Sequence, residues 1–265
     1  VSHLETDFVK KNFKGMVERC GDLGFDLLGG PVEVSPTAHY MMGGVKIDIH
    51  CRTNLPGLFA AGEDAGGTHG ANRLGGNGVA NSTVFGEMAG EAMAGEAGGV
   101  PLENFDQTYG WESIEKTMAA LGRVDSPYPI RTSLKGLMWE KVGLRRNEED
   151  LKPGLDALET LGEQAAGARA EGGQSFNVAW QNVLDVRNQI TVATLIAHSA
   201  IERDESRGSH FRDDIPDQKD DGLYNVFIMM REGKTVVERS PVRFTRVRPG
   251  KEVAPSVSLT EDFVD

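Results

Sequence analysis

The sequence has few cysteines, few aromatic residues and no long apolar run. Its two cysteines, Cys20 and Cys51, fit no metal-ligand spacing and make a poor disulfide framework, which predicts inert thiols in a reducing compartment. Every apolar stretch is shorter than the roughly 20 residues of a transmembrane helix, so no direct membrane insertion is expected. Glu5, Asp7 and Lys10 interrupt any apolar stretch near the N-terminus, which argues against a signal peptide.

Basic residues are also scarce. Lysine and arginine number 28 against 40 acidic residues, for a net charge of -12 at pH 7. This balance argues against binding to nucleic acid or to an anionic membrane surface. What the 265-residue chain does have is glycine, 33 in all and concentrated in the first hundred residues, which indicates a binding site rather than a flexible tail.

The spacing of apolar residues predicts an α/β part followed by an all-α part. In the first hundred residues it predicts a helix over 7–26, short strands at 32–34, 45–49 and 57–62, a glycine-rich loop over 62–78 and a helix over 79–95. Further on it predicts helices over 111–121, 133–142, 147–161 and 175–201, then strands at 223–230, 234–238 and 243–246. Four helices with apolar stripes favour a helical bundle.

The glycine-rich loop has the residue types of a site for a flat or anionic ligand. Gly75 and Gly76 allow close backbone approach, and the following helix directs its positive N-terminal end toward the loop. Arg73 presents a guanidinium fork that matches a carboxylate, unless it is a surface or salt-bridging arginine. His39 is a ligand candidate or a structural histidine, and Glu63 suits a ribityl or ribose hydroxyl or else a helix cap or salt bridge.

Three linked motifs resemble one known family. These are HYMMGG at 39–44, GLFAAGE at 57–63 and HGANRLGGN at 69–77, in this order and close together. They are similar to motifs of the succinate dehydrogenase and fumarate reductase flavoproteins, a family that also includes L-aspartate oxidase. The segments 138–143 and 205–214 resemble the helical domain of the same family. The likeness extends from about residue 32 to about residue 220.

The resemblance implies the C-terminal portion of a Rossmann-like FAD-binding domain followed by a helical-bundle domain, and the strand spacing beyond residue 222 predicts a short β-rich tail. The expected boundaries are 1–34 for the end of a capping domain, 35–100 for the FAD-binding part, 101–222 for the helical domain and 223–265 for the tail. The family's GxGxxG fingerprint and its proton-relay arginine have no counterpart in this sequence. An N-terminal portion of the flavoprotein is therefore an expected partner, and the chain alone is expected to be inactive.

The resemblance also implies roles for individual residues. Hydride would pass between FAD and succinate or fumarate, and no catalytic acid or base is assigned in this chain. The implied substrate ligands are His39 and Arg73, which would hold the dicarboxylate over the flavin. The implied FAD ligands are Glu63 on the ribityl or adenosine side and the backbone amides of Asn77, Gly78 and Val79 at the isoalloxazine.

Two alternatives stay open at this point. The family often has Ser-Leu-Leu after the loop asparagine where this chain has Gly78-Val79-Ala80, so the branch is undecided and L-aspartate oxidase is the nearest rival. The other alternative is a non-catalytic assembly module that docks an iron–sulfur subunit through its helical domain. Either way, we expect a cytoplasmic location, with attachment to the cytoplasmic membrane face only through partner subunits.

The segment 205–214 holds a cluster of charged side chains outside the glycine-rich loop. We expect Arg207, His210 and Arg212 to form an ion-pair network with Asp213, Asp214 and neighbouring acids. We also expect the helical domain to pack on the FAD-binding part without contacting substrate.

Overall fold

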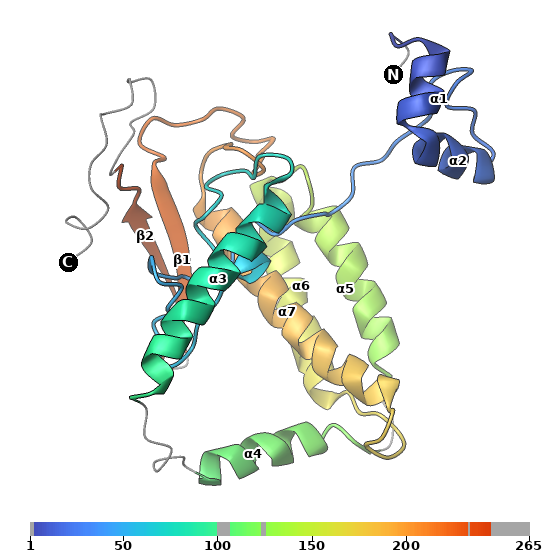
Figure 1. Cartoon of the computed structure of the whole chain (residues 1–265). Coiled ribbons are helices and arrows are strands. Elements are labelled where there is room, and N and C mark those ends of the chain that lie inside the picture. Colours follow the sequence, from blue (N-terminus) through green and yellow to red (C-terminus); the bar gives the residue numbers. More distant parts are fainter. Residues whose placement is uncertain (1–2, 100–106, 123–125, 233, 245–265) are drawn as a thin grey trace. The chain divides into compact units, whose positions relative to one another are not determined.

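The computed structural model describes residues 3–99, 107–122, 126–232 and 234–244, and the chain forms two compact units, 1–40 and 41–265 (Figure 1). The first unit contains α1 (Thr6–Asn12) and α2 (Lys14–Asp22). The sequence predicts a single helix over 7–26, and this prediction is wrong at Phe13, whose φ of -123° and ψ of 33° lie outside the helical region. Residues 31–40 form no helix or strand.

The core of the second unit is a group of three packed helices (Figure 1). They are α5 (Pro127–Lys141), α6 (Glu148–Gly167) and α7 (Val178–Glu202), and they confirm the predicted helices over 133–142, 147–161 and 175–201. Their facing apolar stripes bury Leu151 and Leu158 of α6 against Val183 and Val186 of α7. The fourth predicted helix is α4 (Gln107–Met118).

Asparagine side chains cap α6 and α7 where these helices begin. Asn147 accepts a hydrogen bond from the Asp150 N–H at the start of α6, and Asn177 accepts one from the Trp180 N–H at the start of α7. Each cap satisfies a backbone donor that has no acceptor within its helix. In the part of the chain that the structure describes, no helix is both long and apolar enough to cross a membrane.

A two-stranded antiparallel sheet follows the helices. Strands β1 (Tyr224–Arg231) and β2 (Lys234–Pro241) pair in a register that sets Tyr224 opposite Pro241, and they confirm the first two predicted C-terminal strands. Of the third, predicted at 243–246, residues 243 and 244 form no strand and the other two lie outside the described residues.

The glycine-rich part contains α3 (Asn77–Ala97), which confirms the predicted helix, and a 3-10 turn, η1 (Gly62–Asp64). The strands predicted at 32–34, 45–49 and 57–62 do not form, so that part of the expected Rossmann-like sheet is corrected. A strand needs a run of partner backbone. Here Val45 pairs with Ala65, and Arg52 with Phe59, through isolated single-residue bridges.

Candidate functional site

The turn after the HYMMGG motif and the turn after the GLFAAGE motif are joined by main-chain hydrogen bonds. The Val45 N–H donates to the Asp64 carbonyl at 2.7 Å, and the Gly66 N–H donates to the Val45 carbonyl at 2.9 Å. A Cβ on Gly44 would lie 2.4 Å from the Asp64 carbonyl oxygen, so this approach requires glycine. Two motifs separated in sequence therefore form one continuous backbone surface.

Glu63 adds a side-chain link between the same two turns. Its Oε1 accepts a hydrogen bond from the Met41 N–H at 2.8 Å. This contact gives the carboxylate a structural task in the turn. Its predicted bond to the FAD ribityl or adenosine side stays a prediction.

Arg73 is tied to this surface through its backbone. Its N–H donates to the Met42 Sδ at 3.2 Å, and its guanidinium Nη1 lies 3.5 Å from the Leu74 carbonyl oxygen. The side chain is half-buried, whereas Leu74 beside it is exposed. The Met42 thioether thus holds the Arg73 backbone from which the guanidinium side chain extends.

The first turn of α3 forms the other side of the loop. Gly76 precedes the helix with a φ of 85°, a left-handed conformation that favours glycine, and no described side chain caps the helix. The Asn77 N–H donates to the Leu74 carbonyl at 3.2 Å, whereas the N–H groups of Gly78 and Val79 have no acceptor within the helix. A Cβ at Gly75 or Gly76 would meet no atom within 4 Å, and Leu74 and Val79 are 76% and 79% exposed.

This open, partly apolar face with backbone donors suits a flat ring that carries hydrogen-bond acceptors. An isoalloxazine has this chemistry, so the residues present fit FAD. The specific contacts predicted for the amides of Asn77, Gly78 and Val79 stay predictions.

Asn81 links α3 to the start of the glycine-rich loop through its side chain, a role that the sequence did not reveal. It is buried, its Nδ2 donates to the Gly62 carbonyl at 3.2 Å, and the same nitrogen lies 3.1 Å from His69 Nε2. The amide nitrogen has two protons, so one Asn81 side chain can reach both groups.

The helical region also reaches the glycine-rich loop. The Ser209 N–H and hydroxyl both donate to the Ala71 carbonyl, at 3.0 and 3.1 Å. Nothing in the sequence pattern links these two residues, since 138 positions separate them.

The charged cluster at 205–214 forms a network whose partners differ in part from the prediction. Arg212 binds both oxygens of Asp214, at 2.7 and 2.6 Å, which holds the pKa of that carboxyl well below its usual value. Arg207 pairs with the fully buried Glu205, one of the neighbouring acids expected as partners. His210 packs beside Arg146, and burial together with that cation lowers the His210 pKa to about 4.

Asp213 pairs with Arg145 at 2.7 Å, whereas the predicted partners were Arg207, His210 and Arg212. The acidic partners of Arg207 and Arg212 are therefore as predicted, whereas His210 lies beside Arg146 and Asp213 pairs with Arg145.

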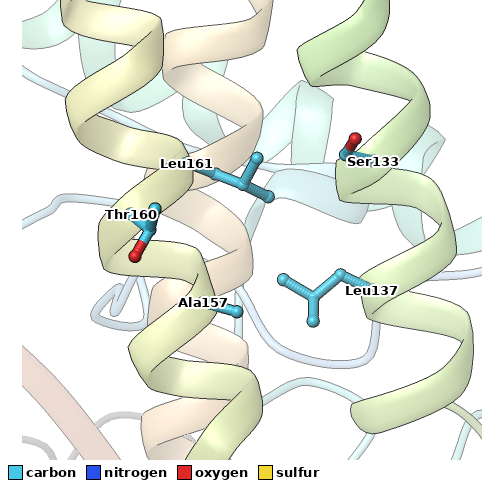
Figure 2. A pocket seen from close by; sticks show the side chains of 5 residues that line it. All are labelled: Ser133, Leu137, Ala157, Thr160 and Leu161. Carbon is cyan, nitrogen blue, oxygen red and sulfur yellow. The ribbon is translucent and has the colours of Figure 1, made fainter.

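His39 belongs to the first compact unit and Arg73 to the second. The expectation that both residues hold one dicarboxylate stays a prediction. The second unit has a shallow pocket of about 300 Å³ between α5 and α6, and Figure 2 shows its lining side chains. They are Ser133, Leu137, Ala157, Thr160 and Leu161, and none is a predicted site residue.

Comparison with family models identifies the class of protein to which the chain belongs. Residues 1–79 match the family model described as an FAD binding domain, and residues 131–256 match the one described as the fumarate reductase flavoprotein C-terminus. The class is that of the FAD-dependent oxidoreductases.

Relatives narrow the class. The chain is 37% identical to a subunit of the fumarate reductase (CoM/CoB) of Methanothermobacter marburgensis, over 86% of this chain and 42% of the relative. It is 32% identical to the L-aspartate oxidase of Synechocystis, over 83% of this chain and 41% of the relative. A solved quinol-fumarate reductase chain is similar with a TM-score of 0.84 and 30% identity, over 93% of this chain and 45% of that chain.

The chain belongs to the fumarate reductase and succinate dehydrogenase flavoprotein family, which includes L-aspartate oxidase and whose cofactor is FAD. It spans about 42% of the length of the fumarate reductase relative that it matches.

Proposed function

We propose that this chain supplies the substrate clamp and one side of the flavin site in an enzyme that interconverts succinate and fumarate. FAD, when bound, supplies the hydride acceptor or donor. In this proposal Arg73 holds one carboxylate through its planar fork and His39 contributes to holding the other. Fixing the substrate and stabilising its charge can lower a reaction barrier by several kcal/mol, on the order of a hundredfold or more in rate.

One observation carries the proposal: Arg73 and the first turn of α3 lie on one loop that is pinned to the HYMMGG turn. Met42 accepts from the Arg73 N–H, and Glu63 accepts from the Met41 N–H. A cation for a carboxylate and backbone donors for a flavin are thereby presented from one fixed surface. In this arrangement the Asn77, Gly78 and Val79 amides face the ring, and Glu63 serves the ribityl or adenosine side.

The proposal includes a partner for the exposed apolar face of the loop. Leu74 and Val79 are large apolar residues with most of their surface in water. An exposed apolar patch of this kind fits an interaction surface. We assign it to bound FAD and to an N-terminal, ADP-binding part of the flavoprotein, which would also bring the proton-relay arginine.

A second candidate substrate is L-aspartate, which also has two carboxylates. The 32% identity to an L-aspartate oxidase favours keeping it. An iron–sulfur subunit is the proposed electron partner for the fumarate reductase alternative, and the proposed location is the cytoplasmic face of the membrane, by way of partner subunits.

The test is an assay of purified 1–265, alone and mixed with an N-terminal flavoprotein part supplied as a separate chain. Both samples receive FAD, succinate or L-aspartate, and an artificial electron acceptor; reduction of fumarate by a reduced dye is measured in parallel. We expect stoichiometric flavin absorbance and succinate–fumarate turnover only after mixing.

Three results would count against the proposal. Turnover by 1–265 alone contradicts the divided site. Oxidation of L-aspartate without succinate or fumarate turnover favours the oxidase. A mixed complex that binds FAD but turns over none of the three substrates favours a non-catalytic assembly role.

A further inference from the structure

We propose that the loop at Gly208 and Ser209 is a positioning element for Arg73: it holds the Ala71 carbonyl, and through it the 71–73 backbone, in the geometry that the carboxylate clamp needs. This inference rests on the proposed role of Arg73 as a substrate ligand. It extends that role by giving the helical region an indirect part in substrate binding, through the position of Arg73.

The first support is the double hydrogen bond at Ala71. A carbonyl oxygen has two lone pairs, and here the Ser209 N–H at 3.0 Å and the Ser209 hydroxyl at 3.1 Å both donate to it. Two donors from one residue restrain the direction of the carbonyl as well as its position. Ala71 and Ser209 are both exposed, so these bonds compete with water and must be held by the surrounding structure to be effective.

The second support is the closeness of the backbone at Gly208. This residue has a φ of 59°, and a Cβ on it would lie 2.2 Å from the Ala71 carbonyl oxygen and 2.5 Å from its carbon. Only glycine fits both the dihedral angle and the contact. The Gly208–Ala71 contact is therefore a specific docking of two main chains.

The third support is that Ser209 projects from a braced hairpin. Arg207 and His210 exchange main-chain hydrogen bonds at 2.8 and 3.1 Å on either side of the tip. Arg207 is anchored by the buried Glu205 at 2.8 Å, and His210 Nδ1 lies 2.8 Å from Arg146 Nη1. The hairpin thus holds in place the Ser209 N–H and hydroxyl that donate to Ala71.

The fourth support is the second anchor, two residues further along the loop. The Arg73 N–H donates to Met42 Sδ at 3.2 Å, so the segment from Ala71 to Arg73 is fixed at both ends. A ligand-binding group must be held within about 0.5 Å of its productive position. A displacement of about 1 Å can cost on the order of a hundredfold in rate.

The experiment uses the mixed two-part flavoprotein described above and three serine variants. Ser209→Ala removes one of the two donors, Ser209→Thr keeps a hydroxyl, and Ser199→Ala is the matched control because its hydroxyl only back-bonds to Leu195 within α7. We expect Ser209→Ala to lower kcat/KM for succinate about twofold to tenfold, the range for one neutral hydrogen bond. Flavin content should stay unchanged, and Ser209→Thr should restore most of the loss.

A double-mutant cycle separates positioning from a general structural role. If Ser209 acts through Arg73, the Ser209→Ala loss should disappear in an Arg73→Lys background. Malonate is a dicarboxylate that can occupy such a site without being oxidised. Its binding affinity, measured from the flavin absorbance change, should weaken by the same factor as kcat/KM. Hydrogen exchange of backbone amides in 69–78 should be faster in Ser209→Ala than in Ser199→Ala.

The outcomes distinguish this inference from the function on which it rests. Normal kcat/KM in an Arg73→Lys variant would show that Arg73 is not part of the clamp. That result would overturn both the proposed function and the positioning role. If Arg73→Lys is impaired but the Ser209→Ala loss persists unchanged in that background, the proposed function stands and the positioning role is overturned. Unchanged kinetics in Ser209→Ala alone would overturn it as well.

Discussion

The Glu205 carboxylate is completely buried, and Arg207 binds both of its oxygens, through Nε at 2.8 Å and Nη2 at 3.0 Å. Arg203 adds a third guanidinium contact at 2.5 Å, and the Lys219 N–H donates to Oε2 at 2.8 Å. A buried carboxylate is tolerated only when its charge is matched and its lone pairs are satisfied. Both conditions are met here, at the point where the hairpin around Ser209 begins.

Glu205→Gln should therefore destabilise the protein strongly. Neutralising the carboxylate leaves two largely buried guanidinium groups without their shared counter-ion, and breaking such a pair costs about 3–5 kcal/mol. Urea unfolding followed by far-UV circular dichroism measures the loss. Glu148→Gln is the control, because its pair with Lys152 is exposed and one helical turn apart, so its transition midpoint should hardly move. Similar shifts in both variants would contradict the buried-pair account.

Acid should weaken the same hairpin through His210. Burial, then Arg146, then the more distant Arg212 and Arg203 lower its pKa to about 4 from an ordinary 6.5. Between these two values the unfolded chain binds the proton that the folded chain excludes, so stability falls as pH is lowered from 6.5 to 4. The slope from this one group is at most about 1.4 kcal/mol per pH unit.

His210→Gln keeps a polar side chain that does not titrate. Its unfolding free energy should depend less on pH over this interval than that of the parent chain. The difference in slope corresponds to at most one proton taken up on unfolding. Urea midpoints at several pH values between 4 and 7 give the comparison. A variant with the same pH slope as the parent would show that His210 titrates normally.

The sequence predicted the helices well and the FAD-domain strands poorly, for a physical reason. Leu151, Leu158 and their neighbours repeat at helical spacing, and a helix satisfies its backbone within its own segment. A strand needs a second segment, and Val45 and Phe59 each find only a single-residue bridge in the described residues.

The site was partly predictable for a related reason. Glycine patterns and a lone arginine located the loop that carries Arg73. Its braces could not be read from the sequence: Asn81 meets Gly62 across 19 positions, and Ser209 meets Ala71 across 138. Such contacts depend on how distant segments pack, which no local periodicity records.

The paired turns offer a sharp comparison between two adjacent glycines. Gly44→Ala places a Cβ 2.4 Å from the Asp64 carbonyl oxygen, whereas a Cβ on Gly43 meets no atom within 4 Å. Gly44→Ala should therefore separate the two turns and lower flavin content and turnover in the mixed flavoprotein. Gly43→Ala should retain both. The ratio of flavin absorbance to protein absorbance gives the first measurement, and equal losses in the two variants would disprove the close-approach argument.

Arg73→Lys tests the clamp itself. Lysine keeps the charge but replaces a planar fork with a single ammonium group, so a bidentate, charge-assisted pair with a carboxylate is lost. The expected cost is about 1.5–3 kcal/mol in transition-state binding, which corresponds to a fall in kcat/KM of roughly tenfold to more than a hundredfold. The Arg73 N–H to Met42 contact is made by the backbone and should survive, as should the first turn of α3.

Flavin content in this variant should accordingly stay near that of the parent, and the loss should appear in steady-state kinetics with succinate and fumarate. Arg145→Lys is the matched control, since Arg145 is a largely exposed arginine paired with Asp213 in the helical region. Its kcat/KM should be unchanged. A variant at Arg73 that loses flavin in proportion to activity would indicate that the arginine supports the cofactor rather than the substrate. Unchanged kcat/KM would mean that the carboxylate is held elsewhere.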